Sequence, residues 1–140
     1  MATVKDRFSA SSTKNQTYSD FANDLIPHPV VKDVLRYVNE NAVNNSIRNL
    51  VFTNKGERLY QPDVGCDITR MLFEPMSDSV AELMSSTIQK TISDYESRAK
   101  VIAVDVIPYY DRNLYQVVIQ YMIINRQNPI TLNVSLTRVR

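Results

Sequence analysis

The chain has 140 residues, 44% of them hydrophobic and 22% charged, and a formal net charge of +1. This composition is typical of one folded globular domain, and the near-neutral charge offers no field to attract nucleic acid or an anionic membrane. One cysteine and one histidine cannot form an internal disulfide or a usual zinc site, and two glycines cannot form a glycine-rich phosphate loop, so we expect no cofactor and no metal.

The N-terminal residues 1–17 are polar, with little to bury, and are predicted to form a tail that is flexible or ordered by a partner. They lack the features of a signal peptide, which predicts synthesis in the cytoplasm. A single domain is expected over residues 18–140. It begins with an extended segment that crosses the surface through Pro27-His28-Pro29, where His28 is a loop residue and not a ligand.

A short strand is predicted at Val30–Val38 because this segment is rich in β-branched residues. Asn39 is then expected to be the N-cap of a helix over residues 40–52. The helix is predicted from a stripe of apolar residues spaced for one face: Val43, Ile47, Leu50 and Val51. Gly56 is expected to end the turn that follows, because glycine adopts the left-handed conformation readily.

Residues 57–67 contain Pro62 and Gly65 without a sustained period, which predicts an ordered loop. Ile68 and Leu72 indicate a helical turn. A second long helix is predicted from Ser77 or Asp78 to about Tyr95. Its core stripe is expected to consist of Val80, Met84, Ile88 and Ile92, widened by Leu83.

From residue 100 the hydrophobic period changes to two, which predicts strands at about 100–109, 114–125 and 130–139, with turns at 111–113 and 125–129. The apolar run 117–124 is far too short to cross a bilayer. In the last strand the predicted buried residues are Ile130, Leu132, Val134 and Leu136, alternating with Thr131, Asn133, Ser135 and Thr137. The expected fold class is α+β, with two main helices packed on a C-terminal antiparallel sheet of three or more strands.

No catalytic residues are predicted. A glycan hydrolase needs two converging carboxylates, whereas the candidates Glu57, Asp63, Asp67, Glu74 and Glu96 are scattered along the chain. Cys66 and His28 fall on unrelated loops, and Cys66 is expected to be a small buried filler. The tyrosines of the strands are expected to pack across the sheet and not to stack on bases.

Several blocks occur in a fixed order: Ala42-Val43, Ser46-Ile47-Arg48-Asn49-Leu50, Thr53-Asn54-Lys55-Gly56-Glu57-Arg58, Pro62-Asp63-Val64-Gly65-Cys66-Asp67 and Leu72-Phe73-Glu74-Pro75. Together they resemble the small baseplate-wedge family of contractile phage tails, historically called lysozyme-like, which includes the TssE subunit of type six secretion systems. The resemblance covers roughly residues 18–125. Its motif residues in the loop and its flanks are Arg48, Asn49, Gly56, Glu57, Arg58, Pro62, Gly65, Asp67, Phe73, Glu74 and Pro75.

The resemblance implies a partner-binding site where the long helix meets the sheet, because a Glu-Pro-Arg triplet of the family is thought to grip the helical bundle at the wedge core. In this chain Glu96 and Arg98 match the triplet, and Ser97 replaces its proline. The replacement restores a backbone N–H and releases the φ angle that proline fixes. The competing interpretation is an ordinary ion pair at a helix end, which contributes at most about 1 kcal/mol if exposed.

The resemblance also implies that the sheet accepts strands from the first ring of the tail sheath, with Ile130, Leu132, Val134 and Leu136 setting the register. The alternative is a last strand that is already fully paired within the monomer. The implied function is a structural wedge subunit of the virion baseplate, made in the host cytoplasm, with other wedge proteins, the sheath and hub proteins near the tail tube as partners. A peptidoglycan hydrolase and a type six secretion baseplate subunit are the alternatives.

Overall fold

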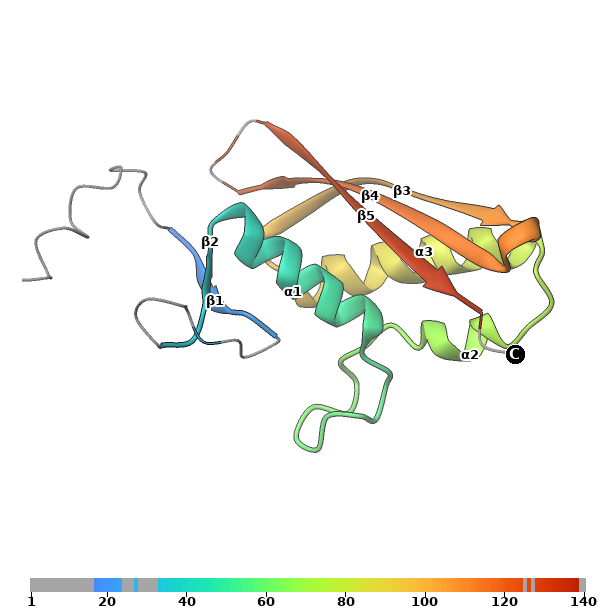
Figure 1. Ribbon diagram of the computed structural model, residues 1–140, viewed down its shortest axis with the longest axis horizontal. Coiled ribbons are helices and arrows are strands. Elements are labelled where there is room, and N and C mark those ends of the chain that lie inside the picture. The colour runs from blue at the N-terminus through green and yellow to red at the C-terminus, as the bar shows by residue number, and fades with distance from the viewer. Residues whose placement is uncertain (1–16, 24–26, 28–32, 125, 127, 139–140) are drawn as a thin grey trace, which may run out of the picture.

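The computed structural model describes residues 17–23, 27, 33–124, 126 and 128–138. Two helices, α1 and α3, lie on one face of a C-terminal sheet, and a small two-stranded ribbon lies beside the start of α1 (Figure 1). The elements in order are β1 Ser19–Phe21, β2 Arg36–Val38, α1 Glu40–Phe52, α2 Ile68–Leu72, α3 Asp78–Tyr95, β3 Ala99–Tyr109, a 3-10 turn at Tyr110–Arg112, β4 Leu114–Ile123 and β5 Pro129–Thr137. The predicted α+β class is confirmed.

The sheet is an antiparallel meander with the strand order β3-β4-β5, as predicted. Tyr121 of β4 is paired with Val101 of β3 and with Ile130 of β5, which fixes the register of all three strands. The ladder between β3 and β4 is regular except for a shift between Val101 and Ala103. Such a bulge locally disrupts pairing on the strand that carries it, so β3 is a less regular edge than β5.

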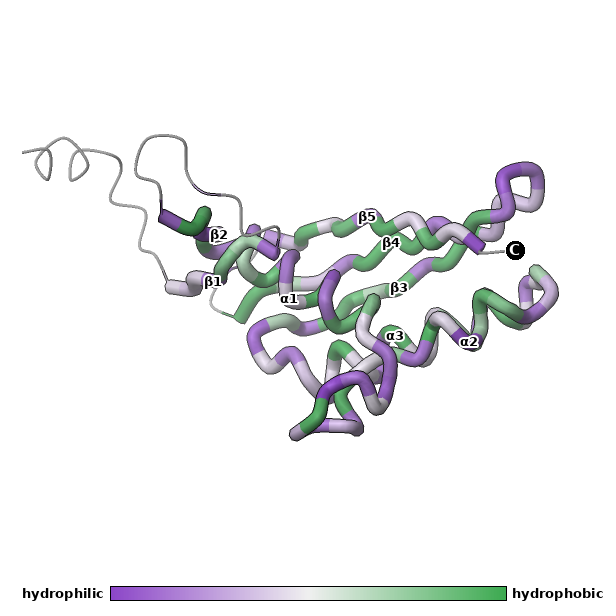
Figure 2. The backbone as a smooth tube through the Cα atoms, turned by 60° about the horizontal axis from the view of Figure 1, so that its bottom comes forward, coloured by the Kyte–Doolittle hydropathy of each residue, from purple (hydrophilic) through white to green (hydrophobic). Residues whose placement is uncertain are grey.

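One face of the sheet is buried against the helices, and hydropathy alternates along its strands (Figure 2). The buried residues of β4 are Tyr115, Val117, Ile119, Tyr121 and Ile123. On β5, Val134 and Leu136 are buried, whereas Ile130 and Leu132 are only partly buried against the core. The alternation predicted for this strand is confirmed, and its first half leaves apolar surface uncovered.

Helix α3 begins where predicted, because the Ser77 hydroxyl accepts a hydrogen bond from the Val80 backbone N–H at 3.3 Å. Met84, Ile88 and Ile92 of its stripe are fully buried. The expectation for Leu83 is wrong, since this side chain is 51% exposed. It lies about 100° around the helix from Met84, outside the buried stripe, which also includes Ala81 and Thr91.

Helix α1 buries the four apolar residues predicted for its core face, and Gly56 has the expected positive φ of 84° after the helix ends. Asn39 is the N-cap residue of α1, as predicted, but its side chain does not cap the helix. Asn39 has φ 52° and ψ −113°, far from the extended conformation of a capping residue, and its side chain makes no cap hydrogen bond. Its Oδ1 instead accepts from the backbone N–H of Thr17 at 2.9 Å and more weakly from Tyr18.

Residues 17–23, which we call the N-terminal arm, contain a strand where the sequence predicted only an extended surface segment. In it β1 pairs antiparallel with β2, with Ser19 opposite Val38 and Phe21 opposite Arg36. The strand predicted at 30–38 is therefore shorter, although Val34 also forms an isolated bridge with Pro27. Residues 1–16, His28 and residues 30–32 lie outside the described residues. Within the part of the chain that is described, no helix is long and apolar enough to span a membrane.

Candidate partner-binding site

Glu96 and Arg98 form a bidentate ion pair in the segment between the end of α3 and the start of β3. The Nε of Arg98 donates to Oε1 of Glu96 at 2.7 Å, and its Nη2 donates to Oε2 at 2.7 Å. The backbone N–H of Glu96 closes the helix by donating to the Ile92 carbonyl at 2.9 Å, and the Glu96 carbonyl accepts from Ala99 at the start of β3. The pair therefore fixes the corner between helix and sheet.

The two partners differ in burial, because the side chain of Glu96 is 4% exposed and that of Arg98 is 29% exposed. Burial alone would raise the pKa of Glu96, but hydrogen bonds from Arg98 and Ser46 and the Arg98 charge together lower it. The hydrogen bond to Glu96 in turn raises the pKa of Arg98. The carboxylate is thus held ionised and inward, while the guanidinium reaches the surface. Ser97 between them is exposed.

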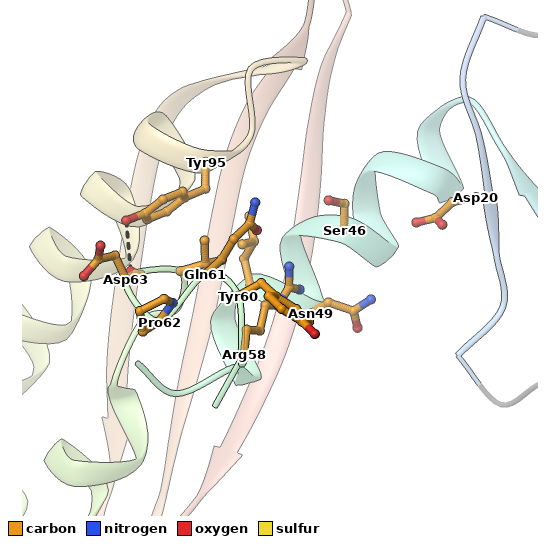
Figure 3. Close-up of a pocket in the computed structure, with 11 residues that line it drawn as sticks. Asp20, Ser46, Asn49, Arg58, Tyr60, Gln61, Pro62, Asp63 and Tyr95 are labelled. Carbon is orange, nitrogen blue, oxygen red and sulfur yellow. Dashed lines mark hydrogen bonds between the residues drawn. The ribbon is translucent and has the colours of Figure 1, made fainter. Parts of the chain in front are cut away.

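A groove of about 760 Å³ lies between α1, the loop after it and the end of α3 (Figure 3). It adjoins the pair through Ser46, which hydrogen-bonds Glu96, and through Tyr95, the residue before Glu96. The Tyr95 hydroxyl donates to the Asp63 carbonyl at 2.9 Å and ties the loop to α3. The groove is lined by Asp20, Ser46, Asn49, Leu50, Arg58, Tyr60, Gln61, Pro62, Asp63, Val64 and Tyr95. It brings together three residues of the loop motif: Asn49, Arg58 and Pro62.

The two glycines of the motif shape the loop that forms this groove. Gly65 is buried at φ 142°, and a Cβ there would lie 2.6 Å from the Thr53 carbonyl oxygen. The Gly56 N–H donates to the Pro62 carbonyl at 2.7 Å across the loop. Glu57 stabilises the same turn, since its Oε2 accepts from the Asn54 N–H at 2.9 Å.

The other motif residues lie elsewhere. Arg48 lines a separate hollow between α1 and Leu132 of β5. Asp67 adopts a left-handed conformation before α2 and lies 3.7 Å from Arg70. The exposed residues Phe73, Glu74 and Pro75 follow α2. The sequence did not single out Leu59 and Tyr60, which are 93% and 97% exposed; two large apolar residues in a loop without periodicity were the available signal.

Two of the five candidate carboxylates are held by other contacts. Glu57 is bonded to a backbone N–H within its own loop, and Glu96 is bonded to Arg98 and held ionised, which does not suit a general acid. Cys66 is fully buried as predicted, and burial raises the pKa of its thiol. Among the described residues, no three His, Cys, Asp or Glu residues group in a way that could hold a metal ion.

Comparison with known proteins connects this geometry to one family. The family described as baseplate wedge protein gp25 matches residues 38–128. Baseplate wedge protein gp25 of Enterobacteria phage T4 is 33% identical over 116 residues, which cover 83% of this chain and 87% of that protein. These two matches show that the chain is of the baseplate wedge class. This chain belongs to the baseplate wedge protein gp25 family.

Solved structures show that the fold is shared more widely. A putative tail lysozyme from Geobacter sulfurreducens matches with a TM-score of 0.65 at 21% identity, covering 70% of this chain and 89% of the other. A chain of the anti-feeding prophage baseplate matches with a TM-score of 0.61 at 19% identity, covering 88% and 87%. At these identities the similarity extends to the fold alone.

Proposed function

We propose that this chain is a non-enzymatic structural subunit of the baseplate wedge of a contractile phage tail, where it binds the helical core of the wedge and begins sheath assembly. Membership of the wedge protein family carries the first part of this proposal. The mature location is the tail baseplate, after assembly in the host cytoplasm. The other wedge proteins and the first sheath ring are its main partners, and hub proteins near the tail tube are a further candidate.

The wedge core contact is assigned to residues 96–98, with different roles for the two charged residues. Glu96 faces inward and is almost fully buried, so it supports the site, whereas the partly exposed Arg98 and the exposed Ser97 meet the partner. A guanidinium held in a fixed plane presents donors suited to carbonyl and carboxylate groups at the end of a partner helix.

The test removes both charges together, because removing only Arg98 would leave a buried carboxylate without its partner. The double variant Glu96→Ala/Arg98→Ala is co-expressed with the other wedge proteins of the same tail, and its co-purification with them is measured. We expect the double variant and Arg98→Lys, which loses the planar fork, to be lost from the wedge. Arg70→Ala on α2, where Arg70 has an 84% exposed side chain, is the matched control and should bind normally. Normal binding by a folded double variant would refute the assignment.

The sheath contact is assigned to the outer edge of β5. Within the described residues, no strand pairs with that edge, and β5 has a regular ladder with β4. An unpaired edge is a template for an added strand, and such a strand would cover the apolar surface that Ile130 and Leu132 leave partly exposed. Val134 and Leu136 are already buried and would set the register.

A charge placed on that apolar surface should block strand addition while leaving the wedge contact intact. We expect Ile130→Lys and Leu132→Lys to be incorporated into baseplates that fail to start a sheath when viewed by electron microscopy. Thr131→Lys changes an exposed residue of the same strand and should assemble normal tails. Normal sheaths with both test variants would exclude β5 as the starting edge.

The hydrolase alternative has one supporting observation, the similarity to a structure described as a putative tail lysozyme. The purified chain is therefore assayed on peptidoglycan beside a known lysozyme. We expect no lysis. Lysis that disappears with Glu57→Gln, Glu74→Gln or Glu96→Gln would replace the structural proposal with an enzymatic one.

A further inference from the structure

The N-terminal arm lies against the exposed side of the Glu96–Arg98 pair. The Arg98 Cζ lies 5.7 Å from the centroid of the Tyr18 ring, within the range of a cation–π interaction. Asp20, two residues further along β1, lines the groove beside the pair. The charge of Asp20 acts on the Arg98 guanidinium, raising the pKa of Arg98 after the larger contribution of Glu96.

Helix α1 holds the arm in this position through asparagine side chains. The Nδ2 of Asn45 lies within hydrogen-bonding distance of the Phe21 carbonyl at 3.2 Å and of Asp20 Oδ2 at 3.4 Å. Asn49 exchanges two hydrogen bonds with Asn23, at 2.5 and 3.0 Å. Asparagine is a poor helix former, so its repeated use on α1 is explained by contacts outside the helix.

The start of the arm is fixed as well. The backbone N–H of Thr17 donates to Asn39 Oδ1, and the backbone N–H of Asn39 donates to the Tyr18 carbonyl at 2.8 Å. This reciprocal contact holds the backbone of residues 17–18 against the start of α1, with the Tyr18 ring beside Arg98. It also occupies the Asn39 side chain, which makes no cap hydrogen bond to α1.

We propose that the arm is part of the wedge-binding site, in which Tyr18 and Asp20 position the Arg98 guanidinium for the partner. The inference rests on the proposed wedge contact and adds residues outside the span 38–128 that the family matches. Of the five N–H donors of a guanidinium, two are used by the Glu96 carboxylate, which leaves three for a partner. The two bonds to Glu96 set the plane of the guanidinium, and the Tyr18 ring and the charge of Asp20 help to hold it there, which restrains the direction of those three donors.

The experiment compares replacements of Tyr18 that keep or remove the aromatic face. Affinity is measured by calorimetry against the co-purified complex of the other wedge proteins of the same tail, prepared without this chain. We expect Tyr18→Leu to weaken binding about fivefold, since it keeps apolar bulk but loses the cation–π interaction. Tyr18→Phe keeps the ring face and should bind like the unaltered chain, while Asp20→Asn should weaken binding in the same direction as Tyr18→Leu.

Tyr110→Leu is the matched control, because it makes the same substitution at a tyrosine that is 55% exposed and lies in the turn after β3, outside the arm. It should bind normally, and thermal unfolding should show that every variant is folded. If Arg98→Lys weakens binding but Tyr18→Leu does not, the arm does not contribute to the wedge-binding site. This inference then fails while the wedge contact stands. If neither Arg98→Lys nor the folded double variant Glu96→Ala/Arg98→Ala weakens binding, the wedge contact itself fails. A loss in Tyr18→Phe equal to that in Tyr18→Leu would also overturn the role of the ring.

Discussion

Glu96 lies inside the fold and holds Arg98 at its surface through two hydrogen bonds of 2.7 Å. A carboxylate that is 4% exposed cannot contact a partner without leaving its place, whereas the guanidinium can do so where it is. The two residues thus perform different tasks, one structural and one available for binding. Replacing Glu96 and replacing Arg98 should therefore change the free energy of unfolding by different amounts.

Replacing either residue of the pair should destabilise the domain, and Arg98→Ala should do so more strongly. Arg98→Ala leaves a buried carboxylate unpaired, which we expect to lower the free energy of unfolding by about 3 kcal/mol at pH 7. Glu96→Ala leaves a partly exposed guanidinium that water can reach, so about 2 kcal/mol is expected. Urea denaturation of both single variants and the double variant measures the coupling. Additive losses would show that the pair contributes no interaction energy.

The pair should also make stability depend on pH below neutrality. The pKa of Glu96 is lowered in the folded chain, so its contribution is present above the unfolded value near 4.5 and is lost as pH falls through the folded pKa. Glu96→Gln lacks this dependence. The stability difference between the unaltered chain and Glu96→Gln should therefore be constant from pH 7 to about 5 and should shrink below about 4.5. A difference that grows on acidification would contradict the direction of the pKa shift.

The two glycines of the loop should respond very differently to substitution by alanine. At Gly65 the added Cβ would lie 2.6 Å from the Thr53 carbonyl oxygen, and φ is 142°, so we expect a loss of about 3 kcal/mol or more. At Gly56 a Cβ would meet nothing within 4 Å, and only the positive φ of 84° opposes it, for about 1 kcal/mol. Urea denaturation of both variants gives the comparison. Equal losses would mean that the backbone at Gly65 relaxes.

The elements with a clear period were predictable from the sequence because burial of one face imposes that period. Ile47 and Ile88 lie on their expected stripes, and the alternation of β5 is visible in its residues. The loop of residues 57–67, which we call the motif loop, was also predicted as ordered, because Pro62 and Gly65 favour turns in its backbone. These features depend on contacts that many residues share.

The features that the sequence did not reveal depend on single contacts between distant segments. Asn39 is the N-cap of α1, but its side chain accepts a hydrogen bond from Thr17, 22 residues earlier, and not from the helix. The Tyr121 hydroxyl donates a hydrogen bond to Asn44 Oδ1, 77 residues away, at 2.7 Å. No local sequence pattern predicts that contact. The spacing of Glu96 and Arg98 was visible, but the unequal burial that separates their roles was not.

Ile88 and Leu83 of α3 provide a test of the core, because Ile88 is fully buried and Leu83 is 51% exposed. Ile88→Ala should lower the free energy of unfolding by about 3 to 4 kcal/mol through lost burial and a residual cavity. Leu83→Ala should change it by less than about 0.5 kcal/mol. Urea denaturation with an unchanged m-value checks both. A large loss at Leu83 would mean that this side chain is covered in solution.

Cys66 can report how the motif loop opens, because it is fully buried next to Gly65. Burial raises the pKa of its thiol, although Thr91 and Lys55 act in the opposite direction, so the reactive thiolate is scarce at neutral pH. We expect the thiol to react with an aromatic disulfide reagent at pH 8 much more slowly in the folded chain than in urea. Gly65→Ala strains the backbone beside the thiol and should accelerate that reaction, whereas Gly56→Ala should accelerate it much less. Rapid labelling of the unaltered folded chain would show that the loop opens freely, and its groove would then be no fixed surface for a partner.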